Sequence, residues 1–180
     1  MARPRALDIF KGIKTDTIRR NSQRSAKWLI NKMRTAANNK VLMRTKPNIG
    51  GMYLFVYDAK TKDRLPFWDA APLVIPMKFL KGGFAGINFH YLPQKDRLAL
   101  FQILGGMTNK SQLRITYAQL KNLSNGRWKF AYKRYLFSHM RTRFLNIDKT
   151  EWRDALLLPV ANFQKQSQRK VYSTFTRGKF

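Results

Sequence analysis

The sequence predicts an α+β fold, with a small SH3-like antiparallel β-barrel at its centre, a long basic N-terminal helix and a C-terminal helical section. Short apolar runs separated by turn residues occupy the middle of the chain, and longer stretches without Gly or Pro lie on either side. Charge follows the same division. Residues 1–48 carry 13 basic and 2 acidic side chains, residues 49–109 carry 7 and 4, and residues 110–180 carry 16 and 3.

Composition excludes several classes of protein. The 180 residues include 36 Lys and Arg against 9 Asp and Glu, which gives a formal net charge of +27, and there is no Cys. A disulfide framework and a cysteine zinc site are therefore excluded. No apolar run approaches the ~18 residues of a membrane span, and the N-terminus lacks a signal-peptide core, so we expect neither membrane insertion nor export. A hydrophobic content of 44% indicates a folded domain with extensions.

A long basic helix is predicted from about residue 16 to about residue 38. At helical periodicity, Ile18, Leu29 and Met33 fall on one face, and basic side chains fall on the opposite face at spacings that can follow a phosphate backbone. An ordinary amphipathic surface helix is the alternative. Such helices usually mix Glu with Lys, whereas here only Asp16 is acidic.

The central strands are predicted from alternating and apolar runs. We expect strands over Met52–Tyr57, Leu73–Leu80 and Phe84–Tyr91, with Gly86 as a bulge or a barrel corner. Pro72, directly before the second run, and Pro76 within it confine this strand to a sheet edge or a bend. A helix is expected to follow from Pro93 to about Leu104.

The C-terminal section is predicted to be mainly helical. We expect helices near residues 117–121 and from Trp128 to about Met140, the second because large apolar residues recur there at helical spacing. Arg143–Ile147 reads as a strand that returns to the central sheet. Asp148–Glu151 resembles a capping box for a helix over Trp152–Leu158. The predicted organisation is a basic N-terminal arm and helix (1–48), a globular core (49–160, with SH3-like strands at 52–91) and a basic C-terminal tail (161–180).

Evidence for catalysis in the sequence is weak. Asp58, Asp63 and Asp69 with His90 can be drawn as a Mg²⁺-dependent nuclease site, because hard cations prefer carboxylate oxygens. The first two aspartates flank a basic turn, where Asp is a common turn former, and His90 fits a structural role. Asp96 and His139 are the other titratable candidates. No nucleotide-binding or nucleophile motif occurs, so we predict no enzymatic activity, no metal and no cofactor.

Aromatic side chains offer a second kind of function. Phe67, Trp68, Tyr91 and Trp128 have the chemistry to stack unpaired bases, although core packing is the commoner fate of such residues. No motif of the usual RNA-binding modules and no convincing recognition helix is present. We therefore expect nucleic-acid binding through phosphate contacts, with little sequence preference.

The predicted contacts with double-stranded DNA form two basic sets. The first comprises Arg19, Arg20, Arg24, Lys27, Arg34, Lys40 and Arg44, and the second comprises Lys129, Lys133, Arg134, Arg141, Arg169 and Lys170.

The segment Gly50–Pro93 carries a family resemblance. Its runs MYLFVYD, LPFWDAAPLVIP and GGFAGINFHYLP, with the later RFLNIDKTEW and ALLLPV, resemble virion proteins of large contractile-tailed phages known as DNA end protectors. The resemblance implies a non-enzymatic virion component associated with packaged DNA ends near the head–tail neck. The matching residues lie in the neutral centre, so they imply the family's fold, and the basic contact residues remain an inference from charge.

Together these observations predict a structural phage protein of the virion, present in host cytoplasm during assembly, that binds double-stranded DNA non-specifically and caps or protects genome ends. Portal, neck or tail proteins are the expected partners, without membrane contact, and association of several copies is left open. The main alternative is an architectural neck or baseplate protein whose basic arms grip acidic partners. A ribosome-associated protein and the metal-dependent nuclease are further alternatives.

Overall fold

The computed structural model describes residues 42–105, 128–158 and 161–176, together with positions 28, 31, 32, 35 and 36. It has an α+β fold, as predicted. The main sheet contains β1 (Met43–Arg44), β2 (Met52–Leu54), β4 (Leu73–Leu80), β5 (Gly83–Asn88), β6 (Tyr132–Leu136) and β7 (Phe144–Ile147). A second sheet pairs β3 (Trp68–Asp69) with β8 (Phe163–Gln164). The helices are α2 (Gln94–Gly105), α4 (Trp152–Leu157) and α5 (Gln168–Thr176), with 3₁₀ turns η2 (Phe89–Tyr91), η4 (Phe137–His139) and η5 (Lys149–Glu151).

The main sheet has the order β1-β7-β2-β4-β5-β6, and all its pairings are antiparallel. Its two edges, β1 and β6, do not pair with each other, so the described strands form an open sheet and not the closed barrel that was predicted. The sheet is nevertheless bent. Beyond β2, Tyr57 bridges to Met140, and the amide of Arg141 donates to the carbonyl of Val56 (2.9 Å).

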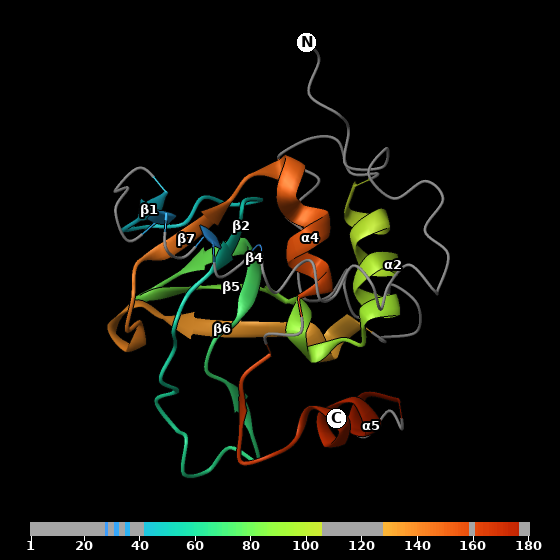
Figure 1. Cartoon of the computed structure of the whole chain (residues 1–180). Coiled ribbons are helices and arrows are strands. Elements are labelled where there is room, and N and C mark those ends of the chain that lie inside the picture. Colours follow the sequence, from blue (N-terminus) through green and yellow to red (C-terminus); the bar gives the residue numbers. More distant parts are fainter. Residues whose placement is uncertain are drawn as a thin grey trace.

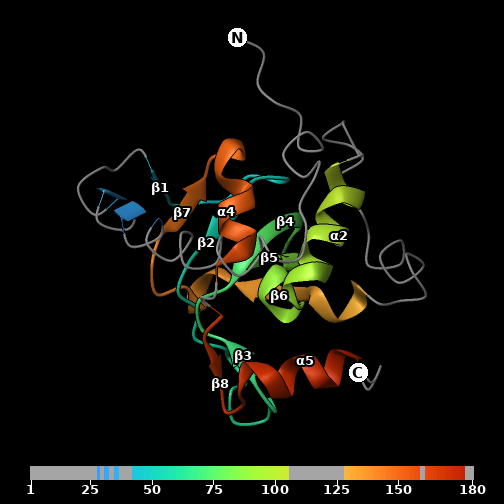
Figure 2. The same ribbon diagram turned by 45° about the vertical axis from the view of Figure 1, so that its right-hand side comes forward.

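Side chains that alternate along each strand build a core on either face of the sheet. Met52 and Leu54 pack into a helix-side core with residues of α2 and α4, which lie side by side over one face in Figures 1 and 2. Tyr53 and Phe55 point to the opposite face and join an aromatic core. There the Phe55 ring lies 5.3 Å from the Tyr135 ring between centroids.

The β4–β5 hairpin confirms one predicted strand and corrects its position. β4 covers Leu73–Leu80 as expected, but it lies between β2 and β5 and is not an edge strand. Pro76 is accommodated because the pairing register with β5 shifts between Pro76 and Lys78. Opposite it, a side chain on Gly86 would place Cβ only 2.6 Å from the Ile75 carbonyl oxygen. The predicted irregularity at Gly86 is therefore a bulge on the partner strand.

The helix predicted from Trp128 to Met140 is wrong. Residues 128–131 form a 3₁₀ turn, and β6 and η4 follow. β6 pairs with β5 along its whole length, and its aromatic residues suit a strand. The predicted strand to Tyr91 also ends early at Asn88, because the Asn88 side chain accepts a hydrogen bond from the His90 amide and caps η2.

Other predicted elements are present. α2 begins directly after Pro93, and β7 returns to the sheet between β1 and β2. Asp148 caps η5 by accepting from the Thr150 amide (3.0 Å), and α4 follows. The section expected only as a basic tail contains β8 and α5, which lies apart from α2 and α4 beneath the main sheet (Figures 1 and 2).

Part of the predicted N-terminal helix lies outside the described residues. Trp28, Asn31, Lys32, Thr35 and Ala36 have helical backbone, and Ala36 is buried in the helix-side core. The Trp28 indole and the Lys32 ammonium group both donate to the carboxylate of Glu151. The helix predicted near residues 117–121 also lies outside the described part. None of the described helices is long and apolar enough to cross a membrane.

Candidate nucleic-acid interface

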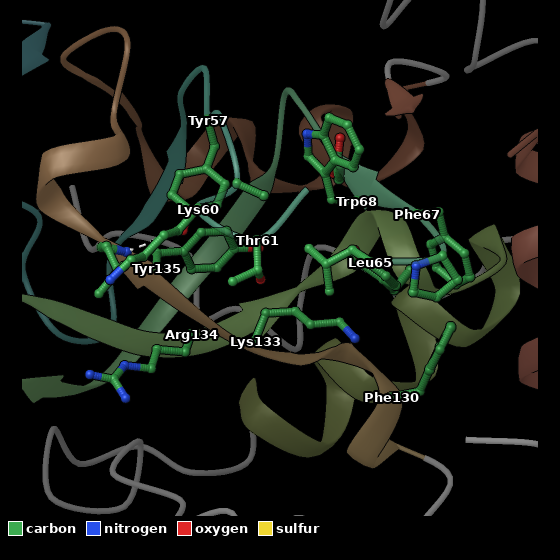
Figure 3. Close-up of a pocket in the computed structure, with 15 residues that line it drawn as sticks. Tyr57, Lys60, Thr61, Leu65, Phe67, Trp68, Phe130, Lys133, Arg134 and Tyr135 are labelled. Carbon is green, nitrogen blue, oxygen red and sulfur yellow. Dashed lines mark hydrogen bonds between the residues drawn. The ribbon is translucent and has the colours of Figure 1, made fainter. Parts of the chain in front are cut away.

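A pocket of about 580 Å³ opens beside β6. We call it the aromatic pocket, and Figure 3 shows it in close-up. The loop after β2, strand β3, the 3₁₀ residues before β6 and β6 itself form its walls. Its lining residues are Tyr57, Ala59, Lys60, Thr61, Leu65, Pro66, Phe67, Trp68, Asp69, Tyr91, Phe130, Lys133, Arg134, Tyr135 and Leu136.

One wall of the pocket is a cluster of rings from four segments. The Tyr91 ring lies 5.3 Å from the Phe130 ring and 5.1 Å from the Phe163 ring between centroids, and Phe67 lies 6.0 Å from Tyr91. These segments meet because β3 pairs with β8, with Trp68 opposite Gln164 and Asp69 opposite Phe163. The wall is therefore fixed by packing before any ligand arrives.

Lys133 brings a positive charge into this apolar setting. Its Nζ atom lies 4.2 Å from the centroid of the Tyr91 ring and 4.8 Å from that of Phe130. None of the ion pairs in the described part of the chain includes Lys133. Burial lowers the pKa of Lys133 to about 8. In Figure 3 its side chain extends across the pocket, whereas that of Arg134 points away from the Lys133 ammonium group.

Asp69 is the acidic residue of the lining, and its carboxylate is fully engaged. It accepts hydrogen bonds from the Ala71 and Asn162 amides (3.0 and 3.2 Å), from Asn88 Nδ2 (3.0 Å) and from His90 Nδ1 (2.8 Å). Burial raises the pKa of Asp69, but His90 and the other donors outweigh burial and hold the pKa below its ordinary value. This carboxylate is therefore held within a network of its own and forms no ion pair with Lys133.

His90 completes that buried network. Burial lowers the pKa of His90 and outweighs the attraction of the Asp69 carboxylate, so the ring is neutral. Its Nε2 atom is buried without a hydrogen-bond partner. A neutral ring with its proton on Nδ1 donates to Asp69 and leaves Nε2 as an acceptor without a hydrogen bond. An unpaired buried acceptor costs less free energy than an unpaired buried N–H donor. We assign this tautomer, and with it a structural role for His90.

The rim of the pocket is basic and is held in place by Lys165. Lys60, Lys62 and Arg64 are exposed in the loop between β2 and β3. The Lys165 ammonium group donates to the carbonyls of Lys62 (2.6 Å), Asp63 (3.3 Å) and Leu65 (3.2 Å). The C-terminal section thus fixes the loop that forms one side of the pocket.

A second hollow of about 460 Å³ adjoins the first across η4, and we call it the basic groove. Lys46, Arg141 and Arg143 line it, and all three are exposed. Arg141 also donates to Asp58 (2.5 Å), and this bond, with one from Lys62, lowers the pKa of the Asp58 carboxyl. The two hollows together form a surface where cations outnumber free carboxylates.

The structure brings together part of the predicted DNA-binding set. Lys133 and Arg134 line the aromatic pocket and Arg141 lines the basic groove. The other described members lie on separate elements, with Arg44 on β1, Lys129 before β6 and Arg169 and Lys170 on α5. The remaining members lie outside the described residues: Arg19, Arg20, Arg24, Lys27, Arg34 and Lys40.

Sequence reasoning missed several contributors to this surface. Lys60, Phe130, Lys46 and Arg143 were not singled out, and Lys165 was noted only as part of a basic tail. The Lys60–Arg64 turn was visible as a basic turn, but nothing local connects it to β6. Of the proposed stacking residues, Phe67, Trp68 and Tyr91 line the pocket, whereas Trp128 is buried in the helix-side core.

The suggested nuclease residues do not converge. Asp58 pairs with Arg141 and Lys62 at the surface, whereas Asp69 is buried with His90. Within the described residues, no group of three or more His, Asp or Glu side chains is arranged to hold a metal ion.

The fold and this surface define an α+β protein with a basic, aromatic-lined site. Comparison with protein families identifies it further. The model of the family described as phage T4 terminal DNA protecting protein matches residues 8–177, so the chain belongs to that family. The resemblance to DNA end protectors is thereby confirmed, and the family's description names DNA protection and no enzymatic activity. No match was found among curated proteins or among solved structures.

Proposed function

We propose that this protein binds the ends of linear double-stranded phage DNA and protects them, as a non-enzymatic structural component of the virion. The observation that carries the proposal is the family match, which covers residues 8–177 and so includes both the basic flanks and the folded centre. The formal net charge of +27 supports it, because a polyanion is the partner that such a charge attracts most strongly.

The proposed contacts are mainly electrostatic. The aromatic pocket and the basic groove are lined by exposed cations from three loops and one strand, at Lys46, Lys60, Arg134, Arg141 and Arg143. Cations of this kind bind phosphates and release counterions without reading the base sequence. The basic N-terminal residues predicted from the sequence are further proposed contacts. The proposed place of action is near the portal and neck.

Exonuclease protection of linear duplex DNA tests this function, with binding to closed-circular DNA measured in parallel over a salt series. We expect the DNA ends to be protected. We also expect the logarithm of the binding constant for the circle to fall linearly with the logarithm of the salt concentration, with a slope of about −0.9 per phosphate neutralised. An Arg134→Gln, Arg143→Gln variant should bind and protect less well. The matched Lys95→Gln, Lys149→Gln variant loses the same charge from exposed positions on α2 and η5 and should behave as the unmodified protein.

Two results would count against the proposal. Steep salt-dependent binding without protection would leave a protein that grips DNA along its length. Absence of DNA binding would favour the alternative in which the basic surface contacts acidic proteins of the neck or baseplate.

A further inference from the structure

We propose that the aromatic pocket receives the unpaired terminal nucleotide of a DNA end, with its base stacked on Trp68 and its phosphate bound by Lys133. This inference rests on the proposed function, because it names the part of a DNA end that the protein recognises.

The ligand must carry an anionic group. Lys133 extends into the pocket, where its ammonium group lies over the rings of Tyr91 and Phe130. The carboxylate of Asp69 lines the same pocket, but four donors already occupy its oxygens. Among the described residues, no carboxylate pairs with the Lys133 ammonium group, and the phosphate of a ligand would supply such a partner.

The ligand must also present a flat apolar surface. The pocket volume of about 580 Å³ lies within the range of small-molecule sites. Phe67, Trp68 and Tyr91 line it, and Trp68 is only half-buried, so part of its ring is accessible. Every base has a π face, so stacking on such rings tolerates any sequence. A nucleotide combines the two required features.

This site distinguishes a DNA end from internal duplex. Within a duplex each base is paired and stacked on both sides, and its removal from the stack costs free energy. An overhanging or frayed terminal nucleotide avoids most of that cost. Surface charge alone binds phosphates anywhere along the duplex, so it cannot give preference for an end. The pocket supplies that preference.

An acidic peptide with an aromatic side chain is the alternative ligand. Its carboxylate would take the place of the phosphate, and its ring would take the place of the base. DNA is favoured by what surrounds the pocket. Lys60 and Arg134 stand at its rim, and the basic groove with Lys46, Arg141 and Arg143 continues the cationic surface past η4. This extended surface matches a backbone that carries a phosphate at every nucleotide.

Competition between two DNA forms tests the pocket in the full-length protein. A linear duplex with a three-nucleotide overhang competes with a covalently closed circle of the same sequence. For Lys133→Met we expect the preference for the linear form to fall by about tenfold, the loss typical of removing a charged hydrogen-bond donor. Lys149→Met is the matched control, since Lys149 also lies over an aromatic ring, 6.0 Å from the Trp152 centroid, but on η5. It should keep the full preference.

Direct binding is measured with a 5′-phosphorylated deoxytrinucleotide as the probe. Stacking should quench tryptophan fluorescence in the unmodified protein, and the quenching should disappear in Trp68→Phe. Lys133→Met should weaken trinucleotide binding, and Lys133→Arg should restore much of it.

The outcomes separate this inference from the function on which it rests. If Lys133→Met keeps its end preference while the unmodified protein protects ends, the pocket assignment is overturned and the proposed function stands. If the trinucleotide binds at Trp68 but the unmodified protein gives no protection, the proposed function fails and the pocket remains a nucleotide site. Quenching by an acidic peptide and not by the trinucleotide would overturn the assignment in favour of a protein partner.

Discussion

Replacing Lys133 by Met should make the protein more stable while it loses its preference for DNA ends. The reason is that the folded state holds the Lys133 charge in an apolar pocket without a carboxylate partner. Met keeps the length and the apolar stem of the lysine but carries no charge. The folded protein then no longer loses the hydration of an ammonium group.

The pKa of Lys133 sets the magnitude. Its decrease from 10.5 to about 8 corresponds to about 3 kcal/mol of unfavourable free energy in the charged folded state, at about 1.4 kcal/mol per tenfold change. Contacts of the ammonium group with two ring faces offset part of this, by about 0.5–2 kcal/mol. The expected gain for Lys133→Met at pH 7 is therefore about 1–3 kcal/mol.

The sign of the pH dependence follows from the same pKa. Above pH 10.5 the lysine is neutral in both the folded and the unfolded chain, so it costs nothing. As the pH falls from 10.5 towards 8, the unfolded chain takes up the proton first and stability is lost. The difference between Lys133→Met and the unmodified protein should thus be largest below pH 8 and should shrink as the pH rises.

Urea unfolding at several pH values between 7 and 10 provides the assay. Lys149→Met serves as the control and should change the free energy of unfolding by no more than about 0.5 kcal/mol. A Lys133→Met variant that is no more stable at pH 7, or whose advantage is the same at every pH, would refute the reasoning. A gain in stability also ensures that weaker DNA-end binding is not caused by unfolding.

Three further substitutions test the parts that support the pocket. Arg97→Met should lower the free energy of unfolding by about 1–3 kcal/mol in urea titrations, because it leaves three buried backbone carbonyls and a Tyr hydroxyl without the guanidinium donor. Asp69→Asn should cost about 3 kcal/mol at pH 7. Because the pKa of Asp69 is lowered in the folded protein, its contribution is present above pH 3.8 and is lost as the pH falls through the folded value, so acid titration should show a flatter decline for the variant. Gly83→Ala should lower the melting temperature, at a cost of about 1–3 kcal/mol, because its Cβ would lie 1.9 Å from the Tyr135 carbonyl oxygen across the β5–β6 pairing.

Each of these has a contrary result. Arg97→Met with unchanged stability would show that the guanidinium bonds only balance the cost of burying the charge. Parallel acid limbs for Asp69→Asn and the unmodified protein would mean that this carboxyl does not control acid stability. An unchanged melting temperature for Gly83→Ala would mean that β6 can move away from β5 at no cost.

Local sequence patterns were sufficient to predict the elements that depend mainly on residues close together in the sequence. The Leu73–Leu80 run is apolar enough to lie between two other strands, and β4 has the predicted bounds. Asp148 marks the start of a helical segment through a bond to a residue only two positions away. Such features can therefore be predicted without knowledge of the tertiary contacts.

The failures involve partners that are distant in the sequence. Large apolar side chains recur at helical spacing at Trp128, Tyr132, Leu136 and Met140. The segment nevertheless contains a strand, because the backbone of β6 pairs with β5, which lies more than 40 residues earlier in the sequence. The pocket has the same origin. The ammonium group of Lys133 lies over aromatic rings because the distant Tyr91 and the nearby Phe130 converge on it, and no local pattern at Lys133 indicates that.

The few acidic residues of this chain also affect how quickly it can find DNA. Asp58 is bonded to Arg141 and Lys62, Glu151 to Trp28 and Lys32, and Asp69 is buried among amides. Cations still outnumber carboxylates by a wide margin, so with a formal net charge of +27 an approaching polyanion meets a positive field. Such a field accelerates diffusional encounter, and ionic strength weakens it steeply. The rate of capture should therefore respond to salt more strongly than the lifetime of a terminal nucleotide already stacked in the pocket.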